Sequence, residues 1–420
     1  MPHLRVLIVG ASIAGPTAAY WLSKAGAEIT IIERFLELRT NGQNVDIRTV
    51  GVTVMRKMAG MEKAVRAKAV PMDGISFVDT HGRSYGIIKP TGDPDQQSLV
   101  SEYEIFRGDL SQILFNLTRD DKNIKYVFGE QVASMRQMSD RGPIAVEFAN
   151  GYPCSEFDLV VACDGATSRT RAMGLECGAQ DHVVPLNSWA AFFSIQKDLL
   201  KQYNIGEAYS APGGRFIAIG SDPSGISRVV LMGIHKRSEQ DSTHMFREAL
   251  KQGESALKGF IKKHFQGGGW KCDEVLEDIM DSQDFYANEM VQIRVPSLYN
   301  GRFVLVGDSG YAPGPTGTGT SLAMAGAYLL AGEIHKHRCD VEAGLKGYQE
   351  RMQPIVDDLQ RIPPLVPTVL APQTTAGIWL RNMIFTFICW SGIMEFSQRF
   401  FAGSFARNEV NRLPDYDWTE

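Results

Sequence analysis

Two groups of residues, about three hundred positions apart, have the types and spacing of a nucleotide-binding site. The first group is a run of small residues, Gly10, Ser12, Ala14 and Gly15, and the carboxylate Glu33 follows it. A glycine turn lets backbone amides approach a pyrophosphate, and an acid roughly twenty residues later can hydrogen-bond a ribose. Ser12 stands where the pattern usually has its second glycine, and its hydroxyl offers a donor to a phosphate. The spacing predicts a bound dinucleotide.

The charge of Glu33 narrows the choice of dinucleotide. A carboxylate at this place repels a 2′-phosphate, so NAD or FAD is favoured over NADP, although Arg34 is adjacent. The alternative is an ordinary βαβ unit whose glycines serve only packing.

The second group begins at Gly307-Asp308 and continues through a loop that contains Pro315, Gly317 and Gly319. Thr320 then opens a long helix of small residues. A helix N-terminus carries partial positive charge and, directed at a flavin, would stabilise its anionic reduced form. A plain glycine-proline loop between a strand and a helix is the alternative. Together the two groups predict one bound FAD.

The elements that must position these groups are apolar runs typical of buried parallel strands. They are residues 5–9, 28–32, 158–162 and 302–306. A helix is expected directly after the first run, from Pro16. Asp164-Gly165 ends the third run, where it is either a turn or a further cofactor contact.

The order of elements predicts an α/β fold. We expect a Rossmann-like FAD-binding domain with an inserted mixed or antiparallel β-sheet substrate domain and a C-terminal helix. The FAD-binding domain is predicted to be discontinuous, with residues 1–73, 104–180 and 285–365. The substrate domain is predicted at 74–103 and 181–284, and the C-terminal helical segment at 366–420.

Three details of these segments can be checked. A helix is expected to break at Pro71, and the runs 74–79, 84–89 and 98–104 are expected to be inserted antiparallel strands. The apolar run 383–390 is too short for a bilayer and predicts a packed helix. An interfacial helix ending at Phe400 and Phe401 is the alternative.

Composition excludes several classes of function. The formal charge is -5 and no basic stripe interleaves with aromatic residues, so no nucleic-acid partner is expected. The six cysteines are scattered, which predicts no metal site, no disulfide framework and a reducing, cytoplasmic compartment. We expect a small-molecule partner and no membrane contact. The oligomeric state is open, and a monomer is compatible.

Three segments carry a family resemblance: the Gly10–Gly15 turn with Glu33, the strand ending at Asp164-Gly165, and the Gly307-Asp308 strand with its loop. In this order they resemble the single-component FAD-dependent aromatic hydroxylases, the family of para-hydroxybenzoate hydroxylase and the tetracycline-inactivating monooxygenase. The resemblance covers most of the chain. It departs at Ser309-Gly310-Tyr311, where the family usually has Ala-Ala-His, and at Gly326, where an aspartate is common. These departures suggest a branch whose substrate is not a simple phenol.

The resemblance implies roles for individual residues. Asp308 would bind the ribityl chain, Arg107 would contact the flavin, and Asp46 would lie beside it. The complete set predicted to bind FAD is Gly10, Ser12, Ala14, Gly15, Glu33, Arg34, Asp46, Arg107, Val132, Asp164, Asp308, Pro315, Gly317, Gly319 and Thr320.

A second set is expected to contact the nicotinamide cofactor or the substrate: Arg39, Arg48, Phe192, Arg215 and Ile217. Arg215 should share a strand face with Ile217, where it either faces a cavity or points to solvent from an edge strand. Phe192 lines an aromatic cavity or belongs to the core. No catalytic base is identified.

The implied activity is that of an FAD-dependent monooxygenase. NADPH or NADH, as a transient co-substrate, would reduce the flavin. Dioxygen would then form a flavin C(4a)-hydroperoxide that inserts one oxygen atom into an aromatic or polyketide-like small molecule. The alternatives are an FAD-dependent dehydrogenase or saturase, and a non-catalytic flavoprotein that sequesters an aromatic ligand. A halogenase is disfavoured because no Trp-x-Trp motif occurs.

Overall fold

The computed structural model describes residues 4–39, 44–70, 72–92, 100–137, 139, 142–200, 204–221, 225–236, 241–338, 340–362, 366–391 and 412–418. The helix break at Pro71 and the interfacial helix ending at Phe400 and Phe401 lie outside the described residues.

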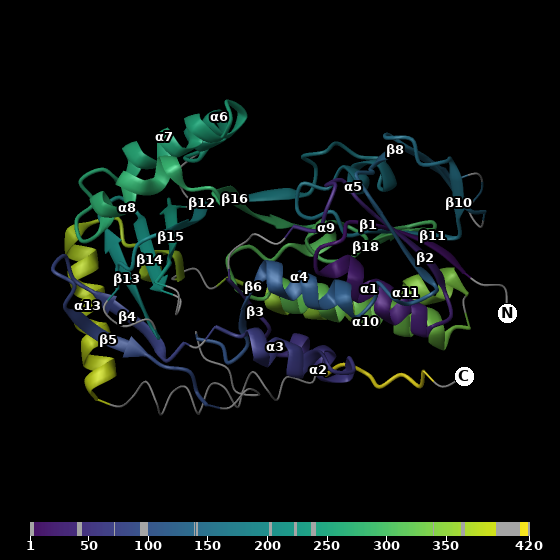
Figure 1. The fold of residues 1–420 in the computed structure, drawn as a ribbon, viewed down its shortest axis with the longest axis horizontal. Coiled ribbons are helices and arrows are strands. Elements are labelled where there is room, and N and C mark those ends of the chain that lie inside the picture. Colours follow the sequence, from purple (N-terminus) through teal and green to yellow (C-terminus); the bar gives the residue numbers. More distant parts are fainter. Residues whose placement is uncertain are drawn as a thin grey trace.

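A six-stranded sheet forms the first part of the molecule, in the order β17-β18-β11-β1-β2-β7 (Figure 1). All neighbours are parallel except the β17–β18 pair. The strands are β1 Arg5–Val9, β2 Glu28–Glu33, β7 Ile124–Phe128, β11 Leu159–Ala162, β17 Tyr299–Asn300 and β18 Phe303–Leu305. Strand β11 and residues 6–9 of β1 are apolar and buried, as expected for a sheet that is covered on both faces.

Helices cover one face of this sheet and a small sheet covers the other. Val6 and Ile8 of β1 pack into a core shared with the helices, whereas Leu7 packs against the small sheet. The small sheet consists of β8 Val132–Gln137, β9 Ile144–Phe148 and β10 Ser155–Phe157. The helices of this part of the chain are α1 Ala14–Lys24, α2 Val50–Lys57, α3 Met61–Lys68, α4 Arg107–Asn116, α5 Arg169–Gly174, α9 Asp308–Tyr311, α10 Gly319–Lys336 and α11 Val341–Leu359.

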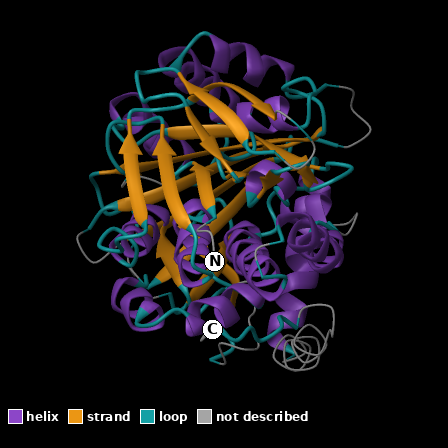
Figure 2. Ribbon diagram, turned by 90° about the vertical axis from the view of Figure 1, so that its right-hand side faces the viewer, coloured by secondary structure: helices purple, strands orange, loops and turns teal. Residues whose placement is uncertain are grey.

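The second part is built on a seven-stranded sheet, in the order β16-β12-β15-β14-β13-β4-β5. Its strands are β4 Gly74–Val78, β5 Ser84–Ile88, β12 Val183–Ile195, β13 Ile205–Ala211, β14 Arg215–Ser221, β15 Ser227–Ile234 and β16 Tyr286–Ile293. One face packs on α6 His244–Lys251, α7 Glu254–Phe265, α8 Cys272–Asp278 and the 3₁₀ turn Ile279–Asp281. Figure 2 shows this upper group of helices and the larger group below the strands.

The pairing at the two ends of this sheet extends the sequence expectation. Strand β16 pairs with β12, so the sheet continues past residue 284. Strand β4 pairs in parallel with β13, so the sheet is mixed, as the predicted mixed or antiparallel sheet allows. The predicted domain boundaries remain predictions.

The expected third inserted strand, 98–104, is wrong for its described part. Residues 100–103 lie outside the strands, and Glu104 begins β6, Glu104–Phe106, which pairs with β3, Asn44–Asp46, in a separate ribbon. The reason is packing, because Ile105 is fully buried in the core of the first part of the molecule.

Two helices follow α11 along the chain: α12 Val366–Leu370 and α13 Thr375–Trp390. Helix α13 packs on the edge of the seven-stranded sheet: the rings of Phe385 and Phe77 are 5.1 Å apart, and Thr386 donates to the Tyr85 carbonyl. Its other face, with Phe387 and Trp390, is exposed, so the predicted packed helix is packed on one side only. Within the described ranges, no helix combines the length and apolar character needed to cross a membrane.

Candidate functional site

The first glycine group forms a turn in which two positions accept no side chain. Gly10 has φ +110°, and a Cβ there would lie 2.6 Å from the Cys163 carbonyl oxygen. A Cβ at Gly15 would lie 1.9 Å from the Gly10 carbonyl oxygen. Glycine at these positions therefore lets α1 start directly against β1 and leaves the backbone of the turn open to a ligand.

Glu33 is held at the end of β2 by backbone donors. Its Oε2 accepts from the Ala11 amide at 3.0 Å and its Oε1 from the Phe35 amide at 3.2 Å. The carboxylate is therefore fixed at the mouth of the glycine turn, where the predicted ribose contact requires it.

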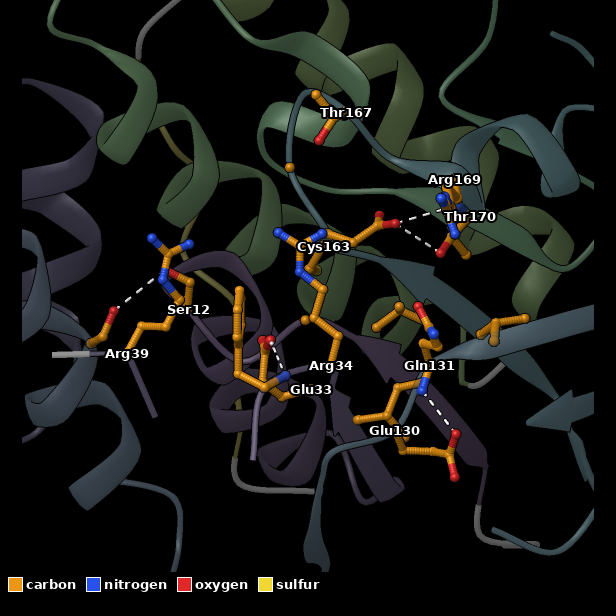
Figure 3. A pocket seen from close by; sticks show the side chains of 18 of the residues that line it. Ser12, Glu33, Arg34, Arg39, Glu130, Gln131, Cys163, Thr167, Arg169 and Thr170 are labelled. Carbon is orange, nitrogen blue, oxygen red and sulfur yellow. Dashed lines mark hydrogen bonds between the residues drawn. The ribbon is translucent and has the colours of Figure 1, made fainter. Parts of the chain in front are cut away.

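A cavity of about 570 Å³, which we call the fingerprint cavity, opens beside this turn (Figure 3). The ends of strands β1, β2 and β11 meet there, which is where parallel α/β sheets bind ligands. Of the predicted site residues, it brings together Gly10, Ser12, Glu33, Arg34, Arg39, Arg107, Val132 and Asp164. Further lining residues that sequence reasoning missed include Gln131, Thr167, Arg169 and Tyr286.

Charges of both signs line the fingerprint cavity, and the arginines are in the majority. Arg34, Arg39, Arg107 and Arg169 line it together with the carboxylates Glu33, Glu130 and Asp164, and Arg107 donates to the Ser12 hydroxyl at 3.3 Å. Arg39 is exposed at the rim, where partial desolvation and the nearby charge of Arg107 lower the pKa of its guanidinium. A pyrophosphate would relieve this crowding of like charges.

Asp164 is oriented by its own loop. It accepts from the Ser168 hydroxyl at 2.5 Å and from the Thr170 hydroxyl at 2.9 Å. Burial raises the pKa of its carboxyl, and these hydrogen bonds oppose the increase.

The second glycine group meets the first in space. A Cβ on Gly307, which has φ +76°, would lie 3.0 Å from the Cβ of Ala14. The next residue, Asp308, is exposed to solvent. Desolvation by the surrounding protein raises the pKa of its carboxyl, while the charge of Arg107 lowers it. Arg107 therefore connects the fingerprint cavity with the Gly-Asp segment.

The loop before α10 lies beside two carboxylates. A Cβ on Gly319 would lie 3.6 Å from Oδ1 of Asp308, and one on Gly317 would lie 3.4 Å from Oδ2 of Asp46. Thr320 is buried in the first turn of α10, and Pro315 is exposed. The glycines thus leave open backbone next to Asp46 and Asp308.

Arg48 fastens the Asp46 segment to α10. Its guanidinium forms an ion pair with Asp46 at 2.9 Å, and its backbone amide donates to the Ser321 hydroxyl at 2.8 Å. Burial raises the pKa of Asp46, and the charge of Arg48 opposes the increase.

The residues present fit FAD. The glycine turn, Glu33 and the arginine-rich cavity suit an adenosine pyrophosphate. The open backbone at Gly317 and Gly319, with Asp308 beside it, suits the ribityl and ring end. That these residues bind FAD remains a prediction.

A second cavity, of about 270 Å³, lies between the seven-stranded sheet and the β3–β6 ribbon. We call it the sheet cavity. Its walls are mainly apolar and include Phe192, as expected, together with Ile75, Phe106 and Val230. Tyr286 lines both cavities, so the two are neighbours.

Arg215 and Ile217 lie away from the sheet cavity, against expectation. Ile217 packs into the core under α6–α8, on the opposite face of the sheet. Arg215 donates to the carbonyls of Pro212, His264 and Gln266, and the last two lie at the C-terminal end of α7. Because β14 is an internal strand, this arginine neither faces the cavity nor points to solvent from an edge. It caps a helix.

Sequence reasoning also missed the polar residues of the sheet cavity. Asn44 and Glu104 come from the ribbon, and Arg228 and Asp284 from the sheet side. The only sequence signal was the position of Glu104, three residues before Arg107.

Comparisons with known proteins agree with this geometry. Residues 3–361 match the sequence profile of a family described as FAD binding domain. The chain is 31% identical over 382 residues to FAD-dependent monooxygenase asL4 of Sarocladium schorii, and the alignment covers 86% of each chain. It is 31% identical over 424 residues to Monooxygenase CTB7 of Cercospora beticola, covering 99% of this chain and 98% of that one. Among solved structures, tetracycline destructase Tet(51) matches with a TM-score of 0.75 and 27% identity, covering 99% of this chain and 100% of that chain.

Proposed function

Because this chain belongs to the FAD binding domain family and is an FAD-dependent monooxygenase, we propose that it takes electrons from NADPH or NADH and oxygenates an aromatic or polyketide-like small molecule held in the sheet cavity. Bound FAD supplies the activation of dioxygen, and the protein supplies binding, orientation and exclusion of water.

The observation that carries the proposal is the arrangement of two neighbouring cavities of different character. The fingerprint cavity is lined by four arginines, and the sheet cavity by apolar and aromatic side chains. A charged dinucleotide and an apolar acceptor would thus be held side by side, with Tyr286 between them. Tetracycline destructase Tet(51), which has the same fold, supports a multi-ring substrate.

Transient docking of the nicotinamide cofactor is supported by the exposed position of Arg39. Its guanidinium lies 5.0 Å from the ring centre of Phe35 and 5.8 Å from that of Tyr286, at the edge of the fingerprint cavity. A cationic group at this rim would attract the phosphates of NADPH or NADH without forming a second enclosed nucleotide site.

The test is anaerobic mixing of the FAD-loaded protein with NADPH or NADH, followed by exposure to labelled dioxygen. Bleaching of the flavin, accelerated by a polycyclic aromatic ligand, and products that gain one labelled oxygen atom are expected. Substrate oxidation without label would indicate a dehydrogenase instead. If neither NADPH nor NADH bleaches the flavin, whichever ligand is added, a non-catalytic flavoprotein that binds the ligand is favoured instead.

A further inference from the structure

The β3–β6 ribbon presents a carboxyl group to an otherwise apolar cavity. Its register pairs Asn44 with Phe106 and Asp46 with Glu104. Val45 and Ile105 point into the core of the first part of the molecule, so the alternate residues occupy the opposite face. Asn44, Glu104 and Phe106 from that face line the sheet cavity.

The Glu104 carboxyl is positioned by one hydrogen bond and retains acceptor capacity. Its Oε1 accepts from the Asn44 amide at 2.7 Å. In the described part of the chain, its Oε2 accepts no hydrogen bond. A carboxylate has roughly four lone-pair sites, so the group can accept further donors from a ligand.

The surroundings of Glu104 make it a better acceptor than an ordinary carboxylate. Burial and the negative charge of Asp46, directly opposite on the ribbon, raise the pKa of Glu104 to about 7, while the Asn44 hydrogen bond and the charge of Arg48 act in the other direction. From the sheet side, the groups that face the cavity are Glu207, Arg228, Asp284 and Tyr286.

Arg228 and Asp284 are engaged with each other and with Ser194 on the sheet side of the cavity. The Arg228 guanidinium contacts Asp284 at 3.4 Å and stacks over the Phe106 ring at 4.9 Å. The arginine side chain has no hydrogen-bond acceptor atom, so Arg228 cannot accept from a ligand hydroxyl. Glu104 is therefore the carboxyl of the ribbon wall that can meet a ligand donor.

We propose that Glu104 is a substrate-orienting residue, and that in the sheet cavity its carboxylate accepts a hydrogen bond from a hydroxyl group on the substrate ring. The inference rests on the proposed function, in which this cavity holds the substrate. The hydrogen bond fixes the orientation of the ring and polarises the O–H bond, which makes the adjoining ring carbons richer in electrons. Asn44 acts as a positioning residue.

The experiment compares two probes on the FAD-loaded, oxidised protein: 2-naphthol and its methyl ether, 2-methoxynaphthalene. Both stay uncharged from about pH 5.5 to 8.5, because phenols without activating groups, like tyrosine, ionise near pH 10. Any pH dependence in their relative binding therefore comes from the protein. The quantity measured is the ratio of the two dissociation constants, ether over naphthol.

In the wild-type protein this ratio should rise about fivefold as the pH passes through 7, because a charged acceptor forms the stronger hydrogen bond. In Glu104→Gln the ratio should be lower and independent of pH. Glu104→Asp should recover part of the pH dependence. Glu207→Gln, which removes a carboxyl from the opposite, sheet side of the cavity, should keep the wild-type pH dependence of the ratio.

Ala218→Trp fills the sheet cavity and should weaken the binding of both probes equally. That result would show that both probes bind in this cavity. A flat ratio in the wild-type protein, an unchanged profile in Glu104→Gln, or loss of the profile in Glu207→Gln would overturn the inference, as would full binding of both probes to Ala218→Trp. Incorporation of labelled dioxygen is a separate readout. If oxygen is incorporated while the ratio stays flat, the role of Glu104 fails and the proposed function stands.

Discussion

One added methyl group at Gly15 should separate this protein from its cofactor. In Gly15→Ala the new Cβ would lie 1.9 Å from the Gly10 carbonyl oxygen and 3.2 Å from Cγ2 of Ile8. Neither neighbour is the free end of a flexible side chain, because one is backbone and the other is buried in β1. Relief of the first contact requires α1 to move away from β1 by about 1 Å. That movement also displaces the amides that would face the pyrophosphate.

Two costs contribute to the expected effect. Overpacking a buried contact of this kind costs about 1–3 kcal/mol. Loss of FAD removes a further stabilisation of about 2.7 kcal/mol when the free cofactor is present at one hundred times its dissociation constant. Together they predict a loss of about 4–6 kcal/mol in the free energy of unfolding of the FAD-loaded protein.

The assay is flavin content after purification, with thermal unfolding measured with and without added FAD. Gly259→Ala is the matched control: Gly259 is an exposed residue of α7, and a methyl group added there would have nothing within 4 Å of it. This control should keep its flavin and gain up to about 1 kcal/mol from helix propensity. Gly15→Ala protein that binds FAD with wild-type affinity would refute the reasoning.

Three further substitutions test the roles of Arg107, Arg215 and His264. Arg107→Met removes the cation whose charge lowers the pKa of Asp308 and that donates to the Ser12 hydroxyl, so FAD affinity in a fluorescence titration should fall at least about tenfold; unchanged affinity would contradict this role. Arg215→Met removes the cap of α7 and should lower the free energy of unfolding in urea by about 1–3 kcal/mol without changing flavin content, whereas flavin loss in a folded protein would mean that Arg215 acts at the cofactor site. Burial lowers the pKa of His264 to about 4, below its unfolded value near 6.5, so the unfolded state binds the proton first and stability falls as the pH drops from about 6.5 towards 4. His264→Phe should lose about 1–2 kcal/mol less than wild type between pH 7 and pH 5 in urea unfolding, and parallel losses would disprove the assignment.

Features that depend on neighbouring residues in the chain could be predicted from the sequence. The turn at Gly10, its strand and helix, and the acid at Glu33 form one local unit, and Glu33 lies beside the turn because β2 pairs in parallel with β1. The family resemblance and the monooxygenase activity are confirmed by the relatives.

Features that depend on distant pairing could not be predicted. Glu104 and Asn44 are sixty residues apart, and only the β3–β6 ribbon brings them into one cavity wall. The face of Arg215 followed from the alternation of β14, but which face the helices cover is decided by α6–α8, which come later in the chain. The run 98–104 was predicted to join the inserted sheet because its alternation resembles that of 74–79. Ile105, however, packs in the core of the first part of the molecule and draws this segment away from the inserted sheet.

The central claim is that one FAD spans both glycine groups, and a crystal structure of the FAD complex tests it most directly. In that complex we expect the pyrophosphate against the backbone at Gly10–Gly15, the adenosine ribose on Glu33 and the ribityl chain on Asp308. A nucleotide bound elsewhere, or one whose ring end lies away from Gly317 and Gly319, would contradict it.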